Sequence, residues 1–387
     1  MASALLMPSS RASLLQPDRR ADTRHWPQTA SARWAVRVAL SVPYLGLAAF
    51  LTAQQLTSEV NTRLEASGHL IQWGSRDLGS FIGVMYPPGP IAIASVLPGG
   101  AVALSWVGAL LAGVVLHAVW ERLLVRGVSG WLIAVLVVCF AATPAFAFLA
   151  TEDLSGFLGL ALFAVALTAF LRFAAEGDTE GGFVCGLSLG LAIACDPAAL
   201  IYALCLAGAA APVALHRYRG QRHSAQASAL VIAFPAVSAL AGWTFLQWLF
   251  TGSPLGWLTH DPNVFAFRSG VLGDLAATGR TMAIGVLVSP LFVISQVLLI
   301  KRRREAMLVA VLPLVGSGLA LWLGLRVASG HTVVLLGLIA LVSVPARPSR
   351  ATSIVLAASA IATLGLVIGW VVASNGLLHV WVDHVFS

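Results

Sequence analysis

Long apolar stretches recur along the whole chain, and short polar segments separate them. About eleven stretches are suited to cross a bilayer, whose apolar core about 30 Å thick needs about 20 apolar residues per helix. They lie near 34–56, 92–119, 131–150, 155–172, 182–196, 198–214, 226–250, 282–300, 306–325, 331–346 and 352–374. The pattern predicts an all-α, polytopic transmembrane helical bundle.

Two neighbouring stretches, 182–196 and 198–214, are short and meet at Cys195-Asp196-Pro197. The pattern alone leaves three interpretations: two spans, a re-entrant hairpin or one broken helix. A single span would place the Lys301-to-Arg304 run on the outer face. Because basic loops favour the cytoplasmic face, the hairpin is preferred.

Composition supports one membrane domain. Of the 387 residues, 58% are hydrophobic and only 10% are charged, which is too little charge to cover a soluble domain of this size. The polar, arginine-containing segment 1–33 is predicted to be a disordered cytoplasmic tail without a cleavable leader. Residues 34–375 then form the transmembrane domain, and 376–387 form a short outside tail.

The basic residues set the expected orientation. With the N-terminus inside, every strongly basic loop falls on the cytoplasmic side, and the outer loops carry mixed or acidic charge. The net charge of +7 is therefore topogenic, and we expect no nucleic-acid partner. Arginine supplies almost all of the basic charge in a chain rich in Ala, Gly, Leu and Val, which is typical of a GC-rich bacterial genome. The predicted location is a bacterial cytoplasmic membrane, with the protein multi-pass and contacting membrane lipids.

Two predicted outside loops, 57–91 and 251–281, are longer than a turn requires, and such loops are often functional. The first contains Arg76-Asp77 and then Tyr86-Pro87-Pro88-Gly89-Pro90. The proline run cannot form a regular helix. It is either a helix breaker at the membrane surface or part of a binding site in which Arg76 and Tyr86 contact substrate.

Carboxylates at the predicted outer face form the main candidate site. Glu152-Asp153 begins a helix, where acidic residues cap free N–H groups and interact favourably with the helix dipole. Alternatively, Glu152 and Asp153 join Asp77 in a cluster that deprotonates an acceptor hydroxyl or holds a divalent metal such as Mg²⁺ or Mn²⁺.

Other polar residues are weaker candidates for substrate binding. Asp196 is either a functional carboxylate near the membrane core or an ordinary turn residue at the outer interface. His260 and Asp261 in the second loop could bind a sugar or a phosphate, and Arg268 could form bidentate contacts with a phosphate. Turn formation and surface solvation are the alternative explanations for these three.

The order of these features resembles the GT-C superfamily of membrane glycosyltransferases, particularly the bacterial relatives of protein O-mannosyltransferases and the lipid A aminoarabinose transferase. Asp77 precedes the Tyr86-Pro87-Pro88 element, an acidic residue opens the stretch Glu152–Leu158, and a short hairpin includes Gly186–Ala192. The last landmark, Phe250–Leu255, resembles a Thr-Gly-x-Pro element. Together these landmarks cover roughly residues 34–260.

The resemblance implies an enzyme that moves a sugar from a polyprenyl-phosphate donor to a lipid, glycan or protein acceptor on the outer face. Asp77 would be the general base, and Asp153 or Glu152 a second acid. The chain departs from relatives at Asp196, where a lysine is common, and in having no large C-terminal domain. A secondary transporter or flippase, and a non-catalytic member of the same fold, are the alternatives.

Overall fold

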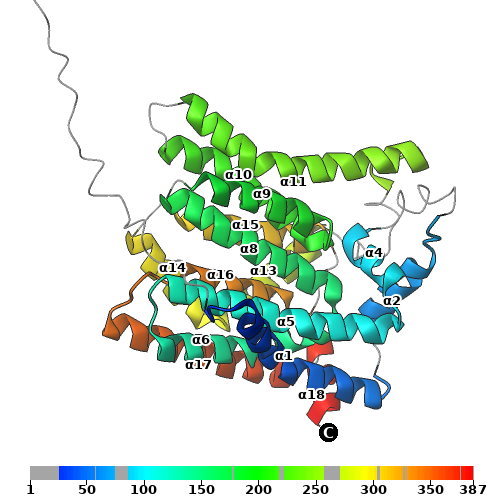
Figure 1. Ribbon diagram of the computed structural model, residues 1–387, viewed down its shortest axis with the longest axis horizontal. Helices are drawn as coiled ribbons and strands as arrows, with labels where there is room; N and C mark the ends of the chain where they lie inside the picture. The colour runs from blue at the N-terminus through cyan, green and yellow to red at the C-terminus, as the bar shows by residue number, and fades with distance from the viewer. Residues whose placement is uncertain are drawn as a thin grey trace, which may run out of the picture.

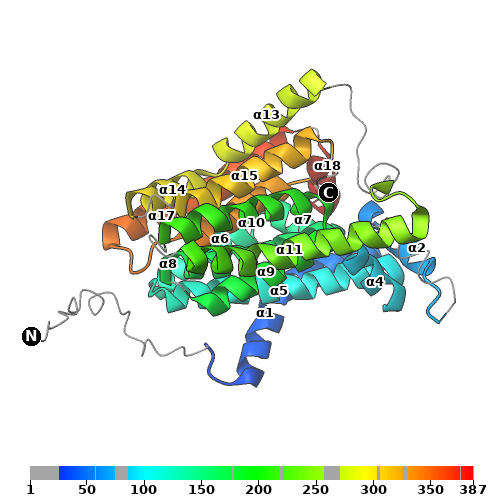
Figure 2. The same ribbon diagram turned by 90° about the horizontal axis from the view of Figure 1, so that it is seen from above.

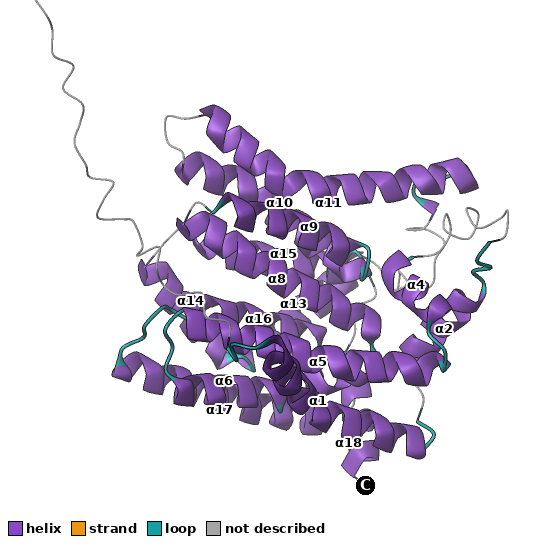
Figure 3. Ribbon diagram, in the orientation of Figure 1, coloured by secondary structure: helices purple, strands orange, loops and turns teal. Residues whose placement is uncertain are grey.

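A computed structural model describes residues 26–56, 58–74, 86–176, 178–217, 222–256, 271–302, 306–325, 327, 329–374 and 376–386. Helices dominate this part of the chain, which contains no β-strand (Figure 3). The first half contains α1 Ala30–Ala53, α2 Glu59–His69, α4 Pro88–Val96, α5 Gly100–Val125, α6 Gly130–Ala141, α7 Pro144–Glu152, α8 Leu154–Glu176 and α9 Thr179–Ile193. The second half contains α10 Pro197–Arg217, α11 Arg222–Thr251, α13 Val271–Leu287, α14 Pro290–Arg302, α15 Ala306–Trp322, α16 His331–Ser343, α17 Arg350–Ala373 and α18 Leu377–Phe386.

Several of these helices are long and apolar enough to cross a membrane. Six satisfy this criterion alone, namely α1, α5, α8, α10, α11 and α17, and the number rises to eight if each of two bent helix pairs is one span. The described chain is therefore a helical membrane protein. The remaining predicted stretches correspond to the shorter apolar helices α9, α15 and α16, so length and composition support six to eight spans and not the full eleven.

Prolines break two of the predicted spans. Stretch 131–150 is divided into α6 and α7, which meet at 61°, and stretch 282–300 into α13 and α14, which meet at 80°. Pro144 has no N–H group, and in a continuous helix its ring would clash with the Phe140 carbonyl, four residues earlier. The Thr143 hydroxyl donates to that carbonyl at 2.8 Å instead. Each of these two predicted spans is therefore a bent pair of helices in the structure.

The predicted first outside loop and the predicted C-terminal tail both contain helices. Within 57–91 lie α2 and the start of α4, and within 376–387 lies α18. The predicted span 92–119 is interrupted between α4 and α5, where Gly99 and Gly100 adopt φ values of 103° and 59°. Only glycine takes such values without strain, so the chain turns there before α5 begins.

The short helix α16 lies at the centre of the bundle. All of its residues except Gly337 are buried, as expected for a helix that is apolar on every side. The long helix α11 runs along an edge of the bundle, and only 11% of its apolar segment is buried (Figure 1). In Figure 2, α1 and α13 stand at opposite edges.

The segment around Asp196 is a hairpin. α9 ends at Ile193 and α10 begins at Pro197, and the two helices pack against each other. The turn between them therefore holds Asp196 in a defined position.

Candidate functional site: a cavity lined by carboxylates

A cavity of about 630 Å³ lies among the segments that precede several helices. We call it the carboxylate cavity. Its polar lining includes Ser58, Glu59, Arg63, Glu152, Asp153, Ser155, Asp196, Ser329 and His384, and its apolar lining includes Pro87, Phe148, Leu377, Val380 and Trp381. The helices α2 and α4, which contribute to its wall, lie at one end of the bundle (Figure 1). A volume of this size is typical of small-ligand sites.

The amino ends of six helices meet at the carboxylate cavity. Residues at or just before the first turns of α2, α4, α8, α10, α16 and α18 line it. Each helix start carries a partial positive charge of about half a unit. The arrangement therefore favours negative charge inside the cavity.

Asp153 lies between α7 and α8 and is only 6% exposed. Its Oδ1 atom accepts the Gly156 N–H at 2.7 Å, so it caps α8 as the sequence suggested. Burial raises the pKa of Asp153 to about 6, and the charge of Asp196 adds to this effect. The Gly156 hydrogen bond and the charges of His331 and Arg63 act in the opposite direction.

Asp196 caps α10 in the same way and is 5% exposed. Its Oδ2 atom accepts the Ala199 N–H at 2.8 Å. Gly159 on α8 leaves room for this side chain, because a Cβ atom at that position would lie 2.5 Å from the Asp196 Cβ. The carboxylate therefore depends on a close approach of α8 to the α9–α10 turn.

The break between α7 and α8 is held by polar residues of α2. Asn61 is fully buried, and its Nδ2 atom donates to the Thr151 carbonyl at 3.3 Å while its Oδ1 atom accepts the Leu154 N–H at 3.2 Å. The Ser58 hydroxyl donates to the main-chain carbonyl of Glu152. These bonds replace those the helix break removes, so α2 fixes the backbone around Asp153.

The Tyr-Pro-Pro-Gly-Pro element binds to the carboxyl end of α9. The Tyr86 hydroxyl donates to the Ile193 carbonyl, and the Gly89 N–H donates to the Ala194 carbonyl at 2.9 Å. The Ser155 hydroxyl donates to the next carbonyl, that of Cys195, at 2.6 Å. Carbonyl groups at a helix end lack partners within the helix, so these three donors stabilise the turn that carries Asp196.

The structure brings together only part of the predicted site. Glu152, Asp153 and Asp196 line one cavity. Tyr86 is buried, does not line the cavity, and supports the α9–α10 turn through its hydroxyl. Its contact with substrate stays a prediction. The remaining candidates lie outside the described residues: Arg76, Asp77, His260, Asp261 and Arg268.

Sequence reasoning missed several residues of the site. Arg63 lines the cavity, where it also pairs with Glu59 at 2.9 Å, and Trp381 enters from α18. Asn61 could have been noticed as a polar residue in an N-capped segment, because its N–H binds the Ser58 hydroxyl at 3.1 Å. The buried His331 carries no comparable local signal, because its contact with Asp196 joins residues far apart in the sequence.

The predicted metal site finds no complete ligand set among the described residues. No three His, Cys, Asp or Glu side chains in that part of the chain are grouped to hold an ion. Asp77 lies outside it. We therefore assign no step of the chemistry to a metal.

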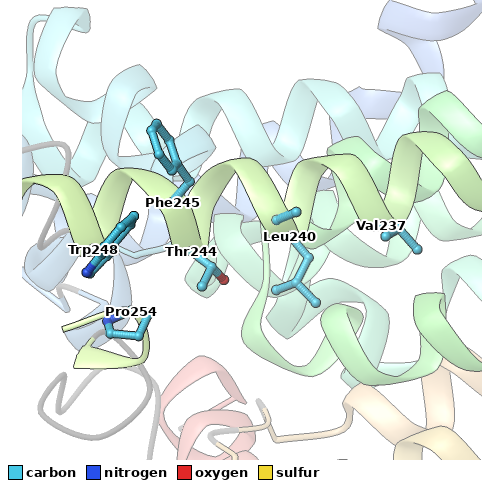
Figure 4. Close-up of a pocket in the computed structure, with 7 residues that line it drawn as sticks. Val237, Leu240, Thr244, Phe245, Trp248 and Pro254 are labelled. Carbon is cyan, nitrogen blue, oxygen red and sulfur yellow. The ribbon is translucent and has the colours of Figure 1, made fainter.

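A second hollow is an apolar groove of about 410 Å³ along α11 (Figure 4). Leu240, Phe245 and Trp248 contribute to its wall, and Pro254 faces Trp248 at one end. Thr244 is a polar residue in this lining. Such a surface on a peripheral membrane helix suits a hydrocarbon chain.

The fold and cavity together define a helical membrane protein with a buried acidic site. Comparison with protein-family models, with curated proteins and with solved structures gave no match. The function must therefore be argued from the site itself.

Proposed function

We propose that this protein is a membrane glycosyltransferase that moves a sugar from a polyprenyl-phosphate donor to an acceptor hydroxyl. The observation that carries the proposal is the convergence of Glu152, Asp153 and Asp196 on one cavity surrounded by helix amino ends. Transfer to a hydroxyl requires a base, and it releases a phosphate that carries negative charge. The cavity contains groups suited to both requirements.

Asp153 is suited to interact with the acceptor. A carboxylate whose pKa is about 6 is largely ionised at neutral pH and remains basic enough to accept a proton. Asp77, which the family resemblance favours as the general base, would share this work from the first loop. Asp153 would then orient the acceptor hydroxyl or assist its deprotonation.

The phosphate of the donor needs positive charge. The amino ends of six helices supply it in partial form, and the guanidinium of Arg63, which also pairs with Glu59, lies at the cavity wall. The groove along α11 would suit the prenyl chain. That helix also packs against the Tyr-Pro-Pro element, because the ring centroids of Trp243 and Tyr86 lie 5.9 Å apart.

The proposed location follows from loop charge. With the N-terminus in the cytoplasm, the carboxylate cavity opens toward the outer face of a bacterial cytoplasmic membrane. Cysteines placed at the exposed cavity residues Glu59 or His384 would then react with a membrane-impermeant thiol reagent added to spheroplasts. Reaction only after the membrane is opened would reverse the orientation.

The test of function uses purified protein in liposomes with radiolabelled polyprenyl-phosphate sugars and a membrane extract as the acceptor source. We expect transfer by the wild type, and a decrease of about 10²- to 10⁴-fold in Asp77→Asn and Asp153→Asn. Asp178→Asn is the matched control, because Asp178 precedes α9 at the end opposite the Asp196 turn and pairs with Arg172. Full activity in both site variants, or none in the wild type, would reject the proposal.

A secondary transporter is the second candidate, and one observation favours it. The two bent pairs, α6 with α7 and α13 with α14, are interrupted helices of the kind found at transporter binding sites. This candidate predicts accumulation of labelled substrate inside liposomes without a new covalent product. The same reconstituted protein therefore distinguishes the two functions.

A further inference from the structure

A buried histidine lies against Asp196 at the wall of the carboxylate cavity. His331 is the first residue of α16 and is 1% exposed. Its Nε2 atom lies 3.7 Å from the Asp196 Oδ2 atom. Within the described residues neither ring nitrogen has a hydrogen-bond partner. Buried polar groups are nearly always paired, so this imidazole requires an explanation.

The surrounding backbone is shaped to bring the two side chains together. Gly330, just before His331, has φ of +79°, and a Cβ atom there would lie 2.6 Å from the Cβ of Ala145. Gly159 makes the corresponding space for Asp196. Two close approaches that only glycine permits therefore frame the pair, and the α9–α10 turn is fixed by its three carbonyl contacts.

The electrostatic surroundings couple the pair to the cavity. Asp153 interacts with the charges of both Asp196 and His331. The Tyr202 ring lies 5.8 Å from the His331 ring, and its hydroxyl interacts with Asp196. Five other ionisable groups surround the pair. They are Tyr202 on α10, Asp153 before α8, Cys195 before α10, Tyr86 before α4 and Arg63 on α2.

We propose that His331 and Asp196 form a proton-holding pair, in which His331 is a positioning residue that acts on the cavity through Asp196. The carboxylate lines the cavity, and the imidazole behind it supplies the second basic group of the pair. Histidine is suited to this role because it gains and loses a proton near neutral pH.

The role of the pair in catalysis rests on the proposed transfer reaction. In that reaction the pair receives the proton that the acceptor hydroxyl loses. The acceptor O–H bond breaks as its oxygen bonds to the sugar carbon. The bond from that carbon to the phosphate oxygen breaks, and the phosphate keeps the electron pair. The proton passes from the cavity carboxylates to the pair and returns to solvent after the products leave.

The decisive experiment is ¹⁵N solid-state NMR of histidine-labelled protein in liposomes. The chain has nine histidines, and His331→Gln assigns the His331 signal by its disappearance. We expect the His331 signal to differ between the wild type and Asp196→Asn at one pH, because the Asp196 carboxylate lies 3.7 Å from the His331 Nε2 atom and a neighbouring charge changes how an imidazole holds its proton. An unchanged His331 signal in Asp196→Asn would overturn the proposal.

Asn is chosen at position 196 because its side-chain oxygen can still accept the Ala199 N–H, so the cap of α10 is kept. If that variant fails to fold, Asp196→Glu replaces it, because glutamate keeps the charge but moves it relative to the imidazole. A His331 signal identical in the Glu variant and the wild type equally rejects the pair. His117→Gln is the control, because His117 is a buried histidine on α5 whose Nε2 atom contacts the Trp26 carbonyl at 3.0 Å, outside the cavity.

Activity gives a second readout. We expect His331→Gln to lower kcat by about tenfold or more with KM changed less than about twofold, and to flatten the pH profile of transfer, since the pair handles a proton and does not touch substrate. A raised KM with unchanged kcat would contradict the role. If the wild type transfers no sugar, the proposed function fails while the NMR result still decides whether the pair exists.

Discussion

The close approach of α8 to Asp196 provides the sharpest test of the site's construction. In Gly159→Ala, the new Cβ atom would lie 2.5 Å from the Asp196 Cβ and 3.3 Å from its Cγ. Real Cβ atoms do not approach this closely, so either α8 or the α9–α10 turn must move. The turn is held by Tyr86, Gly89 and Ser155, and it cannot move without straining those bonds.

Two opposing effects decide the sign of this change. Alanine is favoured over glycine inside a helix by about 1 kcal/mol. Overpacking of a well-packed interior costs typically about 1–3 kcal/mol, and displacing the Asp196 cap of α10 costs about 1 kcal/mol more. We therefore expect Gly159→Ala to lower the free energy of unfolding by about 1–3 kcal/mol, the net of these terms.

Gly365→Ala in α17 is the matched control, because no heavy atom lies within 4 Å of the position its Cβ would take. It should be neutral or stabilising by up to about 1 kcal/mol. Both variants can be compared by thermal unfolding in one detergent, with sugar transfer measured in parallel. If Gly159→Ala is as stable as Gly365→Ala and fully active, the close approach of α8 to Asp196 is wrong.

Three further predictions concern the supports of the cavity. Tyr86→Phe removes the donor to the Ile193 carbonyl and should cost about 1–3 kcal/mol in unfolding experiments, with Tyr44→Phe as a comparison for loss of another buried hydroxyl bond. Asn61→Ala should lower the free energy of unfolding by about 2–4 kcal/mol, because the Thr151 carbonyl and the Leu154 N–H lose their partners. It should also speed proteolysis near the α7–α8 break, and protease resistance equal to that of the wild type would contradict this. Only ionised Asp153 accepts a proton, so transfer should rise as the pH passes upward through about 6, and Asp153→Asn should lack that rise.

Much of the fold could be predicted because lipid imposes a simple rule on sequence. Apolar length identifies a membrane helix when the helix faces lipid, as in α11 and α17. The same rule does not identify α16 correctly. This helix is apolar because protein covers it on every side, and its thirteen residues are too few to cross the bilayer core. The rule also fails at Pro144, where a continuous apolar pattern continues through a change of helix direction.

The candidate site was predictable only where residues act locally. Asp153 was found because an acidic residue at the start of a helix is a recognisable pattern, and Asp196 because an acidic residue between two apolar stretches is unusual. Asn61 and His331 were missed because their roles depend on contacts with residues about 90 and 135 positions away, with Leu154 and Asp196 respectively. The contact of the Tyr86 hydroxyl with the end of α9 could not be predicted, because the sequence pattern showed only a rigid proline-rich element.

Capping and catalysis are compatible explanations for the two carboxylates. An ionised carboxylate offers about four lone-pair positions. Asp153 uses Oδ1 for the Gly156 N–H, and Asp196 uses Oδ2 for the Ala199 N–H. The cap anchors one oxygen and fixes the direction of the other, as a general base requires. At Asp153 the helix dipole favours the ionised form that a base needs, while burial raises its pKa to about 6 and so keeps that form basic. Asparagine preserves the cap and removes the charge, so a stable but inactive asparagine variant separates the two roles.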